Sequence, residues 1–195
     1  PEAILSGVER QLQPGEYLWY RRLLPVDEMD LFNDSRLILH FGAIDYEADI
    51  FLNGNKVTSH RGGYLPIDCD ITDFLEKGEN ELTVRVSDPS DAGFQSRGKQ
   101  ILKRGGIFYT AQSGIWQTVW AEQVPEHYIQ SLLFTPELPE GRIRWMLTAS
   151  APKDARIEIS YQGTPVTEGV TDEDGCGSAV LPPEQLHLWS PEAPN

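Results

Sequence analysis

The sequence is short of cysteine and of positive charge. Its two cysteines, Cys69 and Cys176, lie far apart, without a CxxC pair or metal-ligand spacing. This pattern predicts neither a disulfide framework nor a cysteine metal site, and it favours two buried free thiols. The 16 Lys and Arg residues stand against 30 Asp and Glu, which gives a net charge of −14. We therefore expect no binding to nucleic acid and none to anionic membranes.

Sequence signatures of several enzyme classes are also missing. There is no Gly-x-Ser-x-Gly elbow and no phosphate-binding loop, and the four histidines are scattered without ligand spacing. The stretch "DEDG" at 172–175 fits an Asp-Gly turn better than a calcium loop, since no suitably spaced glutamate follows it. No apolar run approaches the ~20 residues of a membrane-spanning helix. The sequence thus predicts no metal, no cofactor and no membrane segment.

What is present is the composition of a globular protein. The chain has 195 residues, of which 39% are hydrophobic and 24% charged, enough to bury the core of one or two domains. It begins Pro-Glu-Ala, without Met or a basic and apolar leader. We therefore expect it to be a piece of a longer protein.

Alternation of apolar and polar residues dominates the first 124 residues and predicts strands. Leu82, Val84 and Val86 alternate with polar residues, as do Ala48, Ile50 and Leu52. Asn53-Gly54 then marks a tight hairpin into 56–60. Further strands are expected at 17–23 and 37–41. The one helical signal is a short turn in 70–79, with Asp70 or Thr72 as its cap and Gly78 as its end.

The stretch "SGIWQTVWAE" at 113–122 carries two tryptophans four residues apart. Read with a period of two, Trp116, Thr118 and Trp120 share one face, and other apolar residues occupy the opposite face. Apolar residues on both faces predict a central strand that is covered on both sides. We interpret the two indoles as core and interface mass rather than as sugar platforms.

A second all-β domain is expected over 125–195. Strands are predicted at 129–134, 143–149, 156–161, 164–170 and 179–181, separated by turn signals. This spacing favours an immunoglobulin-like sandwich, of which roughly five of the usual seven strands are visible. We therefore expect the domain to be incomplete, with an open sheet edge that favours self-association.

Residues 88–114 form a polar, glycine-bearing loop of a length that is usually functional or disordered. Phe94, Phe108 and Tyr109 could stack on a sugar ring, and the polar side chains that could bind hydroxyls are Asp91, Arg97, Lys99 and Gln100. The alternative is a loop that packs domains together, with its basic residues paired to acidic neighbours. The residues leave both readings open.

Six motifs of the chain closely resemble the N-terminal region of glycoside hydrolase family 2, the β-galactosidases, β-glucuronidases and β-mannosidases. The similarity extends over residues 4–122. In order, the motifs are "WYRR" (19–22), "FGAIDYEADIFLNG" (41–54), "HRGGYLPIDCDITDFL" (60–75), "GENELTVRVSD" (78–88), "RGKQ" (97–100) and "GIFYTAQSGIWQTVWAE" (106–122).

The resemblance implies a jelly-roll sugar-binding domain, 1–124, followed by an immunoglobulin-like sandwich, 125–195. It further implies that catalysis belongs to a separate (β/α)8 barrel that works by a retaining mechanism, so no catalytic residue is expected here. The loop before "GIWQTVW" is expected to help shape the sugar site of that barrel, with Asp88, Arg97, Gly98, Lys99, Gln100 and Tyr109 at matching positions. Some β-galactosidases place a metal-binding aspartate before the Gly-Ile motif, whereas this chain has no acid between Asp91 and Glu122.

Three functional hypotheses follow. The first is the non-catalytic N-terminal region of a family 2 glycosidase, most like a β-galactosidase, which binds carbohydrate together with its barrel and is inactive alone. The second is a free-standing carbohydrate-binding module, which requires an exposed aromatic platform. The third is a structural interaction domain without affinity for sugar.

Overall fold

A computed structural model describes residue 7 and residues 10–26 and 35–194 of the chain. It divides into two compact units, Pro1–Pro125 and Glu126–Asn195. The described residues form β-strands joined by turns and short 3₁₀ helices, with no α-helix among them, so the predicted all-β class is confirmed. In this part of the chain no helix has the length and apolar character needed to cross a membrane.

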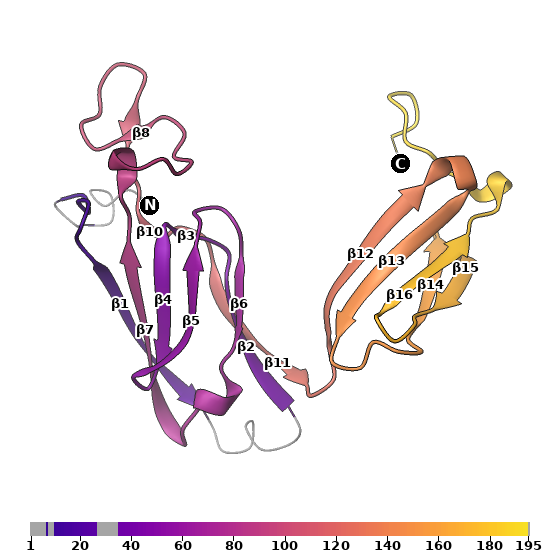
Figure 1. Cartoon of the computed structure of the whole chain (residues 1–195), viewed down its shortest axis with the longest axis horizontal. Helices are drawn as coiled ribbons and strands as arrows, with labels where there is room; N and C mark the ends of the chain where they lie inside the picture. Colours follow the sequence, from indigo (N-terminus) through magenta and orange to yellow (C-terminus); the bar gives the residue numbers. More distant parts are fainter. Residues whose placement is uncertain (1–6, 8–9, 27–34, 195) are drawn as a thin grey trace. The chain divides into compact units, whose positions relative to one another are not determined.

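The first unit contains two larger antiparallel sheets that enclose its core (Figure 1). The four-stranded sheet has the order β1 (Leu18–Val26), β7 (Gly78–Ser87), β4 (Glu47–Leu52), β5 (Asn55–Arg61). The three-stranded sheet has the order β11 (Val119–Pro125), β2 (Ser35–Phe41), β6 (Ile67–Asp70). A short pair, β3 (Ile44–Asp45) with β10 (Gly114–Ile115), adjoins them.

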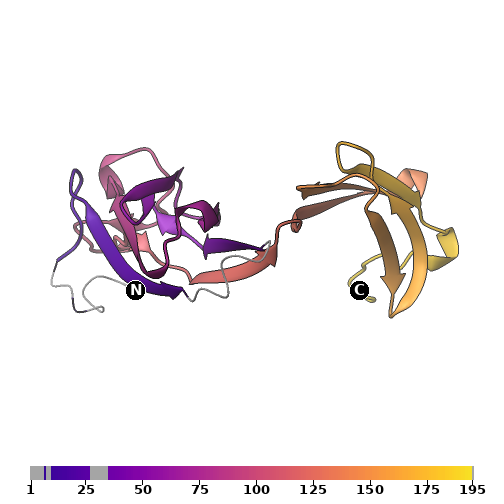
Figure 2. The ribbon, with the colours of Figure 1, turned by 90° about the horizontal axis from the view of Figure 1, so that it is seen from below.

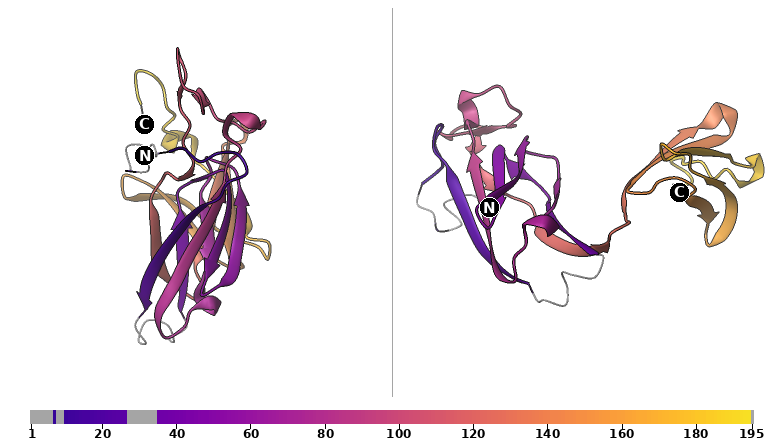
Figure 3. Two further views of the ribbon diagram at one scale, coloured as in Figure 1. Left: turned by 90° about the vertical axis from the view of Figure 1, so that its left-hand side faces the viewer. Right: turned by 60° about the horizontal axis from the view of Figure 1, so that its bottom comes forward.

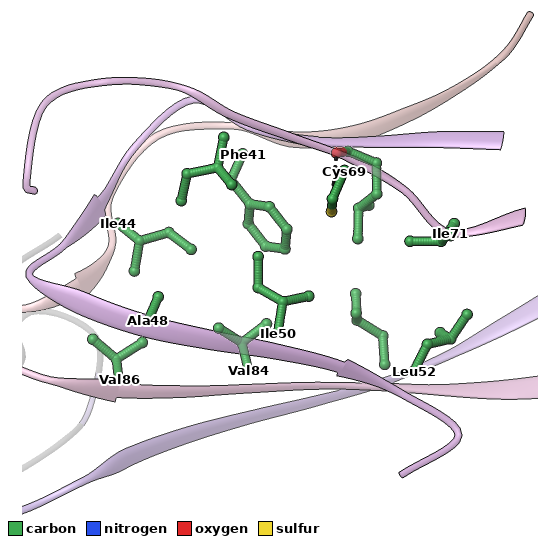
Figure 4. Packing of buried hydrophobic residues seen from close by; sticks show 12 residues of the cluster. Phe41, Ile44, Ala48, Ile50, Leu52, Cys69, Ile71, Val84 and Val86 are labelled. Carbon is green, nitrogen blue, oxygen red and sulfur yellow. Dashed lines mark hydrogen bonds between the residues drawn. The ribbon is translucent and has the colours of Figure 1, made fainter. Parts of the chain in front are cut away.

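The core of the first unit follows the predicted alternation. Ile50 of β4 and Val84 and Val86 of β7 are at most 2% exposed. They face Phe41 of β2 and Ile44 of β3 across the sandwich (Figure 4). Each such side chain contributes roughly 1.5–3 kcal/mol by leaving water, so the alternation alone secures the two-layer arrangement.

The Asn53-Gly54 hairpin is confirmed between β4 and β5. Both residues have positive φ angles, 51° and 78°, as a type I′ turn requires. The Asn53 side chain also reaches into the core, where its Nδ2 donates to Asn80 Oδ1 at 2.7 Å. Asn80 is completely buried; its Oδ1 accepts from Glu76 N at 2.7 Å, and its Nδ2 donates to Glu76 O at 2.8 Å. This amide thus ties the hairpin to the start of β7.

The helical signal corresponds to one turn of 3₁₀ helix, η1 (Thr72–Phe74). Its N-cap is Ile71, without a side-chain cap hydrogen bond, so neither Asp70 nor Thr72 is the cap as predicted; Asp70, one residue earlier, accepts from Thr72 N through Oδ1 at 3.0 Å. The turn ends at Leu75 rather than at Gly78, because Gly78 already begins β7.

The prediction of one central strand over 113–122 is wrong. Ile115 ends β10 and Val119 begins β11, because the chain leaves the β3 pairing and joins the edge of the β11-β2-β6 sheet. Gly114 has a φ of 92°, and a Cβ there would lie 2.1 Å from Tyr20 Oη, so this position requires glycine. Trp116 and Trp120 remain 42% and 48% exposed, so neither is core. The apolar residues of 113–122 occupy both faces because the segment passes from one sheet to another, and not because a single strand is covered on both sides.

The expectation of two buried thiols holds for one cysteine only. Cys69 is buried, and burial with two neighbouring aspartates raises the pKa of its thiol to about 11. Cys176 is exposed, contrary to expectation, because the strand predicted to begin at Ala179 begins at Cys176 and turns this side chain outward.

The second unit has two sheets, whose ribbons can be followed in Figure 2. Their strand orders are β12 (Ile129–Glu137), β13 (Arg142–Ala149), β16 (Cys176–Val180) and β14 (Arg156–Tyr161), β15 (Thr164–Val170). The indole of Trp145 lies at the centre of its core with Ile157 and Ala179. A Cβ on Gly169 or Gly177 would lie 2.7 Å or 2.4 Å from atoms of this indole, so it packs directly against bare backbone.

Asn80→Ala tests the amide that anchors the hairpin. The substitution leaves the Glu76 N–H and the Asn53 amide without their acceptor inside the core. We expect the free energy of unfolding to fall by about 2 kcal/mol or more, measured by urea unfolding. The neighbouring exposed Glu79→Ala should stay within about 0.5 kcal/mol of the parent. Equal effects of the two variants would contradict this role.

Candidate functional site

The predicted loop extends beyond the end of β7 and returns to β10 (Figure 3). It is not featureless: it contains η2 (Ser90–Ala92) and a parallel pair of two-residue strands, β8 (Gln100–Ile101) and β9 (Tyr109–Thr110). We call residues 88–113 the crossing loop.

Asp88 fastens both ends of the crossing loop. It is 4% exposed; its Oδ1 accepts from Ser90 N at 2.7 Å and its Oδ2 from Ser113 Oγ at 2.5 Å. A buried carboxylate is stable only when its oxygens are hydrogen-bonded, as they are here. One side chain thus joins the first and last residues of a long connection.

A tight turn presents the "RGKQ" motif. Gln100 N donates to Arg97 O at 3.3 Å, and Gly98 between them has a φ of 60°, a conformation that glycine adopts without strain. Lys99 O accepts from Tyr109 N at 2.8 Å, and Gln100 Oε1 accepts from Gln112 N at 2.7 Å. The outgoing and returning halves of the crossing loop are therefore tied together at this motif.

The cations of the crossing loop are not used in ion pairs. Arg97 donates through Nη1 to Gly93 O at 3.2 Å, and Arg104 through Nη1 to Thr110 Oγ1 at 3.1 Å. Within the described residues, neither these two nor Lys99 or Lys103 lies within ion-pair distance of a carboxylate. The expected alternative, in which basic residues pair with acidic neighbours, is not seen in this part of the chain.

Aromatic side chains of the crossing loop are open to solvent. Tyr109 is 65% exposed, and Phe94 and Phe108 are exposed as well. Such rings are stabilised by stacking on the apolar face of another molecule. The crossing loop therefore presents exposed aromatic rings together with its cations.

A small recess lies below the motif. Its lining comprises Asp45, Asp88, Ser90, Gln95, Arg97, Gln100, Ala111 and Gln112. Its volume of ≈ 10 Å³ leaves room for at most about one water molecule, so it holds no sugar ring. The fold thus brings together three of the predicted site residues, Asp88, Arg97 and Gln100. Gly98, Lys99 and Tyr109 lie on the outer side of the loop, and Asp91 lies in η2 without lining the recess.

Sequence reasoning missed Asp45. It lies in β3, and burial together with the nearby charge of Asp88 raises the pKa of its carboxyl to about 6. The pairing of β4 with β7 and of β3 with β10 brings it close to Asp88, so no local pattern could have identified it. Among the described residues, no group of three or more His, Cys, Asp or Glu side chains could hold a metal ion.

The pattern of the glycosyl hydrolase 2 galactose-binding domain-like family matches residues 2–117. A β-galactosidase of Thermoanaerobacter pseudethanolicus is 28% identical over 166 residues, which cover 84% of this chain and 21% of that protein. A β-glucuronidase of Rattus norvegicus is 24% identical over 199 residues, which cover 90% of this chain and 30% of that protein. The chain thus spans about a fifth to a third of the length of these two relatives.

A solved structure is similar as well. A β-glucuronidase of an uncultured Clostridium species superposes with a TM-score of 0.63 at 27% identity, over 91% of this chain and 31% of that one.

The carboxyl of Asp45 provides a test by pH. Its pKa is about 6 in the folded chain against an ordinary 3.8, so between these values the folded state holds a proton that the unfolded state lacks. Stability should therefore fall as the pH rises from about 4 to 6 and then level off. Asp45→Asn should remove this fall, measured as the thermal midpoint against pH.

Asp49→Asn supplies a control of opposite sign. Hydrogen bonds from Lys56 and Arg85 lower the pKa of Asp49 to about 2. The stability that ionised Asp49 contributes is present above about pH 4 and is lost as the pH falls toward 2. Asp49→Asn should therefore reduce the loss of stability on the acid side of the profile. If the thermal midpoint of Asp45→Asn depends on pH in the same way as that of the parent chain, the raised pKa assigned to Asp45 is wrong.

Proposed function

The chain belongs to the glycosyl hydrolase 2 galactose-binding domain-like family, and we propose that it is the non-catalytic N-terminal region of a retaining β-glycosidase. The relatives are three to five times as long as the matched region, which leaves room for a catalytic (β/α)8 barrel as its covalent partner. Family relatives include β-galactosidases and β-glucuronidases; we propose a β-galactosidase-like parent.

The unpaired cations of the crossing loop are the observation that carries this proposal. In a chain of net charge −14, Arg97 and Lys99 have no carboxylate partner among the described residues, and their loop has its ends fixed by a buried aspartate. A structural loop would gain from pairing them. A loop that borders a sugar site leaves such donors free for hydroxyls or for a sugar carboxylate.

We assign different roles to the predicted site residues. Arg97, Lys99 and Gln100 donate to sugar oxygens, and Tyr109 offers its ring for stacking. Asp88 and Gly98 position the loop through the contacts described above. Asp91, at the start of η2, offers a carboxylate to a hydroxyl at the rim. The recess holds about one water, so the other wall of the sugar site must come from the barrel.

The second unit is proposed to be an immunoglobulin-like sandwich that links the first to the barrel. Its two sheets enclosing Trp145 and its alternating burial support this assignment. Self-association through an open sheet edge stays a prediction.

The isolated chain should hydrolyse no aryl glycoside, because glycoside hydrolysis needs a pair of carboxyl groups held about 5–10 Å apart around a sugar site. Chromogenic β-galactosides, β-glucuronides and β-mannosides provide the assay. Turnover that copurifies with the chain and survives removal of contaminating glycosidases would overturn the non-catalytic assignment.

In the full-length parent, Arg97→Ala or Lys99→Ala should lower kcat/KM about 10–100-fold, the loss expected when a charged hydrogen bond to substrate disappears. The thermal midpoint should stay nearly unchanged, since the loop is exposed. Arg22→Ala, at an exposed arginine of β1, is the matched control and should alter neither quantity. A lower midpoint with intact kinetics would instead identify the loop as packing.

A further inference from the structure

A separate cluster lies on the outer face of the β11-β2-β6 sheet, away from the crossing loop. The register places Trp120 of β11 opposite His40 of β2, and His40 opposite Asp68 of β6. Residues one step along these strands, such as Phe41 and Ile67, point into the core. Because side chains alternate along a strand, Trp120, His40 and Asp68 form one row across the outer face.

The imidazole of His40 is held at both nitrogens. Nδ1 lies 2.6 Å from Asp68 Oδ1, and Nε2 lies 3.1 Å from Glu122 Oε1. The side chain is only 14% exposed. Two carboxylates on two different strands thus fix the plane of the ring.

The indole of Trp120 stacks on this fixed ring, with centroids 3.7 Å apart and planes inclined by 15°. The other side of the indole is open, and the residue is 48% exposed. β11 forms the edge of its sheet in the described part of the chain, so no strand lies beyond that open side. The molecule therefore presents a flat aromatic ring whose orientation is set before any ligand arrives.

Polar groups surround the open ring. The side chains of Asp68 and Glu122 are 63% and 47% exposed, and each uses one oxygen for His40. The second oxygen of each carboxylate remains able to accept a hydroxyl. This rim of acceptors suits a ligand that is rich in hydroxyl donors and has an apolar face.

Other ligand classes fit less well. An apolar protein partner would require a wider apolar surface, whereas Arg36, four residues before His40 on the same face of β2, is bound to Asp70 and to Asp73 at 3.4 Å. An anionic ligand would meet two carboxylates, and the guanidinium of Arg36 on the same face is already engaged with Asp70 and Asp73. A neutral saccharide needs neither a wide apolar surface nor a cation.

We propose that Trp120, backed by His40 and flanked by Asp68 and Glu122, is a binding site for a neutral saccharide, distinct from the crossing loop. A pyranose ring stacks on the open face of the indole, and its hydroxyls donate to the free carboxylate oxygens. The site does not depend on the role proposed for the crossing loop.

The test uses the whole chain and NMR of the tryptophan indole N–H groups. Cellotetraose, mannotetraose and β-1,4-galactotetraose are the probes, and Trp120→Phe assigns the Trp120 resonance by its loss. At least one tetrasaccharide should shift this resonance with a millimolar Kd. Trp120→Ala should weaken binding about tenfold or more, and Trp120→Phe, which keeps a smaller ring, by less.

The controls separate this site from the rest of the chain. Trp189→Ala removes another exposed indole, in the second unit, and should leave binding unchanged, as should Arg22→Ala at the exposed arginine of β1. His40→Ala should weaken binding severalfold while Trp120 is still present, because the ring loses its backing. Circular dichroism checks that each variant is folded.

Three results would overturn the proposal. One is that no tetrasaccharide shifts the Trp120 resonance at concentrations up to about 10 mM, a range that covers weak single-site binding. Another is that Trp120→Ala binds as tightly as the parent. The third is that light scattering shows self-association that Trp120→Ala abolishes, which would make this face a protein interface.

Discussion

A single buried carboxylate, that of Asp88, connects the sandwich to its long loop. β7 pairs with both β1 and β4 and supplies core side chains up to Val86, and Asp88 directly follows it. Its two oxygens then bind the N–H at the start of the crossing loop and the hydroxyl at its end. Loop closure is entropically costly, and an anchor fixed by the central strand limits that cost. The rigid sandwich and the exposed motif are thereby parts of one framework.

Charge is distributed unevenly over this framework. Several carboxylates of the sandwich pair with cations, as Asp49 does with Lys56 and Arg85. Within the part of the chain that the structure describes, the cations of the crossing loop are unpaired, whereas the Trp120 face carries carboxylates beside an aromatic ring. Two surfaces of one small unit therefore differ in the charged groups that they present, and this difference follows from local pairing rather than from net charge.

Much of the fold was readable from sequence because burial imposes a period of two. The strands around Ile50 and Val84, and the Asn53-Gly54 turn, follow local rules that no distant contact overrides. The reading failed at 113–122, where the chain changes sheet and the apolar residues serve two different partners. The predicted site residues formed one connected loop, whereas Asp45 and the Trp120 row depend on strand pairing that no local pattern reveals.

The central indole of the second unit fits into its core because two neighbouring residues have no side chain. Gly169 and Gly177 leave space that Trp145 fills, and a methyl group at either position would overlap the ring. The side chains at positions 145, 169 and 177 therefore compete for the same space in the core. In related chains they should vary as a set: a smaller residue at the tryptophan position releases room for alanine or serine at the two glycines, and a lineage that changes one glycine first must pass through an overpacked intermediate.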